Sequence, residues 1–177
     1  GLVEWIRHPN DLDEPLGAVV DGTWDREKST VKHKKKMAPF VLKKVALIQM
    51  EKAISSDDGD EYLLGSQLAD QWWEDANLLN TMAWMIADDP AVETRSLELA
   101  QRMAARANDL TESSNSQILN TLSRVCHDRG NLTEAVKWQR LAVENSDDQT
   151  YKKTLSRYEK EKEETKNGGD PGPTINR

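Results

Sequence analysis

The sequence predicts a mainly α-helical protein built from antiparallel helical hairpins that stack along the chain. Apolar residues recur at spacings of three and four, most clearly in two stripes between residues 113 and 148. A Gly130-Asn131 turn separates these stripes, and glycine readily adopts the left-handed conformation that ends a helix. The motif Leu-Asn-Thr-Met-Ala at residues 79–83 returns as Leu-Asn-Thr-Leu-Ser at residues 119–123, which indicates an internal repeat of the hairpin.

Composition narrows the class of protein further. The 177 residues are 37% hydrophobic and 31% charged, which is typical of soluble helices with charged outer faces. No apolar run approaches the ~20 residues that span a bilayer, so we expect no membrane span. A net charge of −7 disfavours a general nucleic-acid binder. The single cysteine excludes an internal disulfide and a cysteine-based zinc site, and the sequence indicates no cofactor.

The first nine residues alternate apolar and polar side chains, and Pro9 closes the run. This pattern predicts a strand over residues 2–7. A lone strand leaves its backbone groups unpaired, and no other segment offers a partner strand. We therefore expect the partner on another chain, giving a homodimer through strand 2–7, or on a segment that precedes Gly1. Because the chain opens on Gly1 rather than on Met, we expect a processed product or part of a longer protein.

Residues 1–25 carry a recognisable series of short motifs. They are Val3-Glu4-Trp5-Ile6, His8-Pro9, Leu12-Asp13, Leu16 and Gly22-Thr23-Trp24-Asp25. The series resembles the last strand and helix of a thioredoxin-like domain, closest to the redoxin (TlpA-like thiol–disulfide oxidoreductase) branch. The resemblance implies a helical repeat region directly behind, and a periplasmic or exported location. Otherwise we expect a cytoplasmic protein.

The same resemblance places the redox chemistry outside this chain. The family's activity needs a Cys-x-x-Cys and a cis-proline loop, and both would precede Gly1. Cys126 is no substitute, because it falls on the apolar stripe of a predicted helix, where a buried and inert thiol is expected.

A long helical region is predicted over residues 24–55, with a boundary at Lys36–Pro39 because proline breaks or kinks a helix. Its basic cluster Lys32–Lys36 fits either an anionic partner or a solvated helix face. The segment Ile54–Ala91 holds nine acids and no Lys or Arg. We expect this acidic block to pair with Lys32–Lys36 or with Lys43 and Lys44. Further helices are predicted over residues 61–74, 74–89, 91–110 and 147–162.

The hairpin at residues 113–148 resembles a tetratricopeptide (TPR) repeat. The residues that carry the resemblance are Leu119, Leu122, Ser123, Cys126, Gly130, Asn131, Ala135 and Ala142. Ser123, Ala135 and Ala142 have the spacing of the family's small residues, whereas Gln139 stands where the family has an aromatic. The resemblance implies a TPR-like right-handed array over residues 26–162, ending in a capping helix and followed by a flexible tail at 163–177. An ordinary antiparallel helical hairpin is the alternative.

The expected function is protein–protein interaction. A groove for a protein or peptide partner would be lined by first-helix residues Asn80, Trp84, Asn120 and Arg124. For the two asparagines the alternative is a hydrogen bond to a neighbouring helix, and their repeated place beside the apolar stripe favours this structural role. The three histidines are isolated, and no nucleophile–base spacing or glycine-rich phosphate loop is present. We therefore expect no catalytic activity from this chain. Two alternatives remain: an assembly element of the parent protein, and a client-selecting segment of a redox enzyme.

Overall fold

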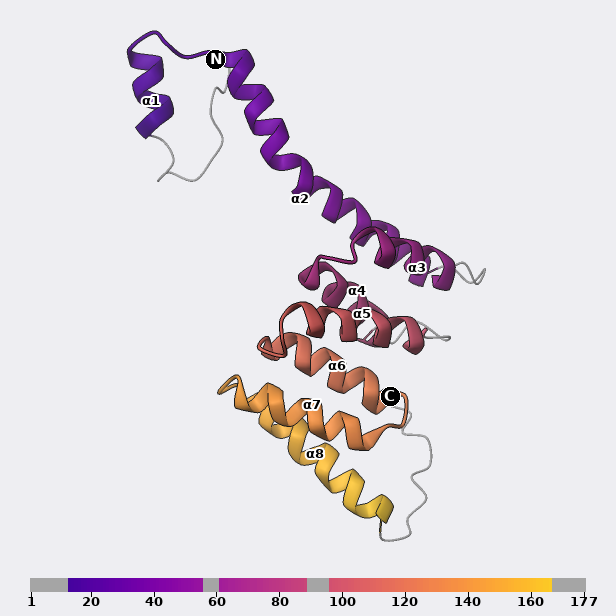
Figure 1. Ribbon diagram of the computed structural model, residues 1–177. Helices are drawn as coiled ribbons and strands as arrows, with labels where there is room; N and C mark the ends of the chain where they lie inside the picture. The colour runs from indigo at the N-terminus through magenta and orange to yellow at the C-terminus, as the bar shows by residue number, and fades with distance from the viewer. Residues whose placement is uncertain (1–12, 56–60, 89–95, 167–177) are drawn as a thin grey trace. The chain divides into compact units, whose positions relative to one another are not determined.

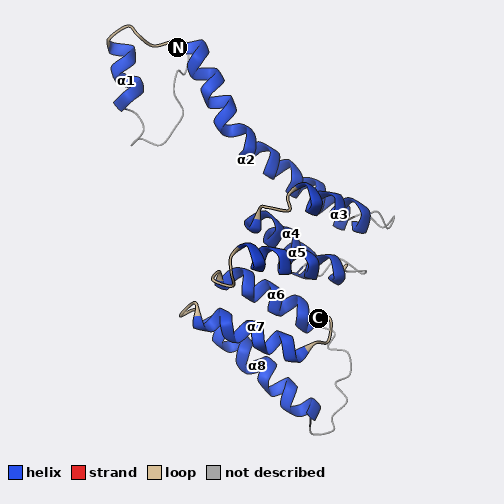
Figure 2. Cartoon of the chain, in the orientation of Figure 1, coloured by secondary structure: helices blue, strands red, loops and turns tan. Residues whose placement is uncertain are grey.

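The computed structural model describes residues 13–55, 61–88 and 96–166 (Figure 1). Eight α-helices make up nearly all of these residues, and none of the described residues forms a strand (Figure 2). The mainly α prediction is therefore confirmed, while the predicted strand 2–7 lies outside the described residues. The helices are α1 (Asp13–Val20), α2 (Arg26–Ile54), α3 (Glu61–Gln71), α4 (Ala76–Asp88), α5 (Leu97–Leu110), α6 (Ser116–Asp128), α7 (Leu132–Glu144) and α8 (Gln149–Lys166).

The chain divides into two compact units, residues 1–45 and residues 46–177. In the first unit, Gly22 has a φ of +70°, the left-handed conformation that a turn after α1 requires. Asp25 then caps α2, because its Oδ1 accepts a hydrogen bond of 2.9 Å from the backbone N–H of Lys28. None of the described helices has both the length and the apolarity needed to cross a bilayer.

Helix α2 continues through Pro39, so the predicted boundary at Lys36–Pro39 is wrong. A proline inside a helix removes one backbone hydrogen bond and crowds the carbonyl four residues earlier, here that of Lys35. Residues 31–42 are all exposed, so water can reach this carbonyl and the lost bond leaves no buried polar group. The helix therefore tolerates Pro39.

In the second unit, each helix from α4 to α8 packs against the next one along the chain, and α4 also packs against α6. The successive helices lie side by side in Figure 1. Apolar stripes meet between them in one continuous core, whose largest fully buried side chains include Met50, Leu79, Met82, Ile86, Leu99, Met103, Ile118, Val125 and Tyr158. Sequential pairing of neighbouring helices, the coarser part of the fold prediction, is thus confirmed.

The turn between α6 and α7 has the geometry that its sequence predicts. Gly130 has a φ of +79°, its N–H donates to the carbonyl of His127, and the next N–H, of Asn131, donates to that of Cys126. These two bonds close the helix in a Schellman arrangement. Asn131 Oδ1 then accepts a bond of 3.2 Å from the N–H of Glu134 and caps α7.

Small residues let the helices approach closely, as their spacing indicates. Ser123, Ala135 and Ala142 are fully buried, and Ser123 Oγ donates a 2.7 Å hydrogen bond to the carbonyl of Ala135. A further small residue, Gly65 on α3, is not part of the repeated pattern. A Cβ at Gly65 would lie 2.7 Å from Leu99 Cδ2, so this glycine allows α3 to pack on α5.

Candidate partner-binding surface

The four residues predicted to line a groove lie in two adjacent rows, which we name the first-helix rows. Each row has a spacing of four residues, so its members share one face of their helix. The rows are Asn80, Trp84 and Asp88 on α4, and Asn120, Arg124 and Asp128 on α6. Helix α4 packs against α6, and Arg124 Nη1 lies 3.5 Å from Asp88 Oδ1. The two rows are therefore neighbours.

The α4 row presents an aromatic ring beside a polar group with unmet hydrogen-bonding capacity. Trp84 is 36% exposed, although most large apolar side chains of this helix are buried. Asn80 Oδ1 is buried and has no hydrogen-bond partner among the described residues. An indole of this kind offers a partner both apolar area and a donor N–H.

The side chains of the α6 row make more contacts within the protein than those of the α4 row. Asn120 Oδ1 accepts a 3.2 Å hydrogen bond from Gln139 Nε2, which also donates to the carbonyl of Tyr151 at 3.2 Å. Gln139 is fully buried, and its amide joins α6, α7 and α8 through these two bonds. Of the two roles that the sequence allowed for Asn120, the structure shows the structural one, a hydrogen bond to a neighbouring helix.

Arg124 is held by two carboxylates, one on each helix of the rows. Its Nε donates to Asp128 Oδ2 at 2.9 Å, and its Nη1 faces Asp88. Burial lowers the pKa of Arg124, but the hydrogen bond and the charge of Asp128 raise it by more, so the pKa is raised overall. The guanidinium therefore stays charged and fixed in orientation.

A network around His127 joins α6 to α8. His127 Nε2 lies 2.7 Å from Glu161 Oε2, and Nδ1 lies 3.2 Å from Asp128 Oδ1. The imidazole stacks on the buried ring of Tyr158, with a centroid distance of 4.3 Å. Burial lowers the pKa of His127, but the hydrogen bonds and charges of Asp128 and Glu161 outweigh it and raise the pKa overall.

Cys126 lies within the core, as its place on the apolar stripe predicts. It is 2% exposed, and burial, aided by the charge of Glu134, raises the pKa of its thiol to about 11. The thiol is therefore protonated at neutral pH and shielded from reagents, which are the properties of a structural cysteine. Among the described residues, no group of His, Cys, Asp or Glu side chains is placed to hold a metal ion.

The acidic block has partners that the sequence analysis missed. Arg102 pairs with Asp70, and Arg106 Nη2 lies 2.6 Å from Glu74 Oε1 while its Nε donates to the carbonyl of Trp73. Both guanidinium groups also lie over the Trp73 ring, at 4.9 and 5.4 Å from its centroid. These contacts tie the end of α3 to α5. From the sequence we expected lysines of α2 as partners instead. The order of residues along the chain does not show which helices pack together, so the pairing with α5 could not be predicted.

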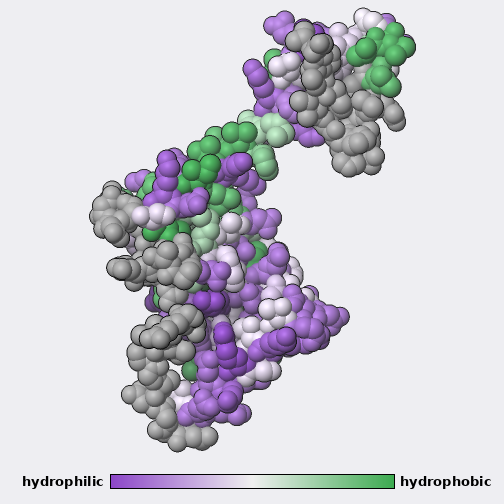
Figure 3. Space-filling model, turned by 180° about the vertical axis from the view of Figure 1, so that it is seen from behind, coloured by the Kyte–Doolittle hydropathy of each residue, from purple (hydrophilic) through white to green (hydrophobic). Residues whose placement is uncertain are grey.

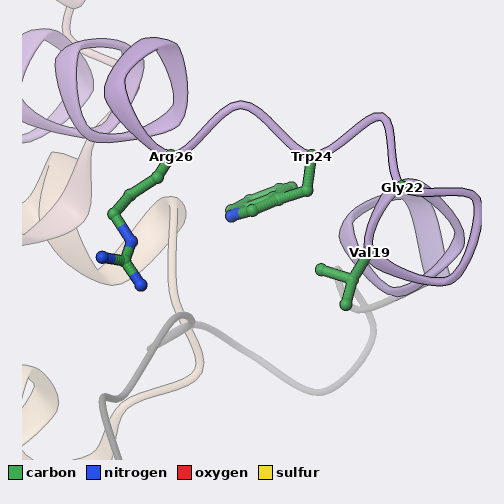
Figure 4. A pocket seen from close by; sticks show the side chains of 4 residues that line it. All are labelled: Val19, Gly22, Trp24 and Arg26. Atoms are coloured by element: carbon green, nitrogen blue, oxygen red, sulfur yellow. The ribbon is translucent and has the colours of Figure 1, made fainter.

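Two hollows are lined by residues other than those of the first-helix rows. A polar one of about 530 Å³ is lined by Thr111, Ser114, Asn115, Ser116, Gln117, Ser146, Asp148 and Tyr151. The other, of about 400 Å³, lies in the first unit and is lined by Val19, Gly22, Trp24 and Arg26. Figure 4 shows the Trp24 ring between the side chains of Arg26 and Val19.

No protein-family model matches this chain, and neither a curated protein nor a solved structure matches it.

Proposed function

We propose that this chain is a non-catalytic protein-interaction scaffold, a TPR-like array in the C-terminal region of a thioredoxin-like thiol–disulfide oxidoreductase. The observation that carries the proposal is the contact between α4 and α6, the first helices of two successive hairpins. Such contacts align equivalent helix faces and generate the continuous binding surface that repeat proteins use. The first-helix rows occupy equivalent positions, 40 residues apart in the sequence.

The chemistry of these rows suits a peptide segment. Trp84 supplies exposed aromatic area, and Arg124 supplies a guanidinium held in place by Asp88 and Asp128. An apolar side chain of the peptide would contact the indole. Aromatic and arginine side chains are the residue types that most often dominate binding energy at interfaces.

A peptide-display selection on the full chain, followed by affinity measurements on variants, tests the proposal. We expect Trp84→Ala to weaken the selected peptides by at least about tenfold, a typical effect of truncating an aromatic anchor. Leu63→Ala is the matched control, because Leu63 on α3 is also exposed, at 60%, but lies outside the rows. Peptides that bind the Trp84 variant as tightly as the unchanged chain would contradict the proposal.

The relation to a redox enzyme requires its own test. A longer protein containing residues 1–177 should catalyse thiol–disulfide exchange, whereas this chain alone should not, because its only cysteine is the buried Cys126. The absence of an upstream Cys-x-x-Cys would remove the thioredoxin-like part of the proposal and leave the scaffold part unchanged. Sedimentation tests the assembly alternative, since a strict monomer argues against pairing through residues 2–7.

A further inference from the structure

Helix α2 carries positive charge in a chain that is acidic overall. Residues 26–45 contain eight Lys or Arg and a single acid, Glu27, so this segment has a charge of +7 whereas the whole chain has −7. Every side chain from residue 30 to residue 42 is exposed. The segment is therefore a concentrated and accessible source of positive potential.

The same helix exposes large apolar side chains. Six of them lie between residues 31 and 45 and are 37–62% exposed: Val31, Met37, Phe40, Val41, Leu42 and Val45. Hydrophobic side chains gather over this part of the molecule in the space-filling view (Figure 3). Single exposed apolar residues are ordinary, but a contiguous group on one helix indicates a contact surface.

Apolar and basic side chains are sorted around the axis of α2. At about 100° per residue, the apolar group covers an arc of about 200° that runs from Phe40 through Val41 to Leu42. The basic arc opposite it holds Lys32, Lys35, Lys36 and Lys43. Lys34 and Lys44 fall within the apolar arc, where a long aliphatic stem can lie along an apolar surface while the ammonium group reaches out. The helix is thus a basic amphipathic one between residues 31 and 45.

We propose that residues 31–45 of α2 bind the surface of an anionic lipid bilayer, with the apolar arc inserted between headgroups and the basic arc facing phosphate. Interfacial helices of this type carry lysine on the polar face and Phe or Leu on the other, and insert by about 5–10 Å. Anionic lipids attract such lysines through the negative surface potential of the bilayer.

The width and the charge of this surface favour a bilayer over other occupants. A single partner helix covers a stripe of about 100°, which would leave half of the apolar arc uncovered. A second copy of α2 would bring two segments of charge +7 together, so like-charge repulsion opposes self-association here. Nucleic acid would use the lysines but would leave the aliphatic side chains of the arc without a partner.

Co-sedimentation of the full chain with vesicles tests the proposal. We expect binding to phosphatidylcholine vesicles that contain phosphatidylglycerol, weaker binding at higher salt, and little binding to phosphatidylcholine alone. The double variant Phe40→Ser, Leu42→Ser should bind about tenfold more weakly or worse, because two anchoring side chains are lost. The triple variant Lys32→Gln, Lys35→Gln, Lys36→Gln should show a similar loss at low salt.

A charge-matched control on another helix tests whether vesicle binding depends on the lysines of α2 in particular. Lys153, Lys160 and Lys166 are exposed on α8, so changing these three to Gln alters net charge equally and should leave vesicle binding unchanged. An equal loss in this control, equal binding to both kinds of vesicle, or no vesicle binding at all would overturn the proposal. Capture by an acidic protein without vesicle binding would overturn it as well.

A site-directed fluorophore tests the orientation of the helix. Because Cys126 is buried, a new cysteine at Val41 or Lys32, which lie on opposite sides of α2, can be labelled selectively with an environment-sensitive dye. Anionic vesicles should shift the emission of the dye at position 41 to the blue and leave the dye at position 32 largely unchanged. Equal shifts at both positions would overturn the proposed orientation and with it the inserted apolar arc.

Discussion

Replacing His127 with alanine should destabilise the attachment of α8 to α6. The substitution removes the contact of His127 with Glu161 at 2.7 Å, its contact with Asp128 at 3.2 Å, and the stack on Tyr158. A hydrogen bond to a charged group contributes about 1.5–3 kcal/mol, and an aromatic stack contributes about 0.5–1.5 kcal/mol. Since Glu161 is partly exposed and screened, we expect a loss of about 2–3 kcal/mol at low pH rather than the full sum.

The loss should depend on pH in a defined direction. The folded-state pKa of His127 is raised above its value in the unfolded chain, so folding favours the protonated imidazole. This contribution is fully present below the unfolded pKa, about 6.5, and disappears as the pH rises through the folded pKa. At high pH the neutral ring still stacks on Tyr158, so a residual effect of about 1 kcal/mol should remain.

Urea unfolding followed by circular dichroism, at pH 5.5 and pH 9, measures this difference. The gap in unfolding free energy between the unchanged chain and His127→Ala should be larger at the lower pH. His33→Ala is the matched control, because His33 is an exposed residue of α2 and its loss should change neither value. The same gap at both pH values would refute the charge-based reasoning.

Three further predictions concern the core, and thermal or urea unfolding checks the first two. Gly65→Ala should cost about 1–3 kcal/mol, because its Cβ would lie 2.7 Å from Leu99, whereas Gly17→Ala, with open space around it, should be neutral or slightly stabilising. Gln139→Ala should cost about 2–4 kcal/mol, because it removes the hydrogen bonds that join α7 to Asn120 on α6 and to the Tyr151 carbonyl on α8 and opens a cavity. Cys126 should react with a thiol reagent only on unfolding; fast labelling of the native chain at pH 7 would contradict its burial.

Local patterns in the sequence were sufficient to predict the helices and much of their packing face. A helix brings residues three and four apart onto one side, so the stripes containing Leu119, Leu122 and Cys126 predicted what the core buries. The left-handed conformation of Gly130 follows from local backbone sterics alone. The error at Pro39 arose because the cost of a proline depends on whether water reaches the freed carbonyl, and exposure is not visible in the local pattern.

That Asn80, Trp84, Asn120 and Arg124 line a groove for a partner stays a prediction. The repeated spacing places the first two on α4 and the last two on α6, which pack against each other, because equivalent residues of successive hairpins occupy equivalent faces. It could not show that Asn120 accepts a hydrogen bond from Gln139. That bond depends on the rotation of α7 about its axis, which the packing of the whole core determines.

The sequence by itself determined where the helices lie, which of their faces are apolar, and where small residues permit close approach. Only the tertiary structure decided the polar partners, since Arg102 pairs with Asp70 and His127 with Glu161 across more than 30 residues of chain. The physical reason is the separation along the chain over which each kind of interaction acts. Helix formation depends on neighbours within one or two turns, whereas an ion pair forms wherever packing brings opposite charges together.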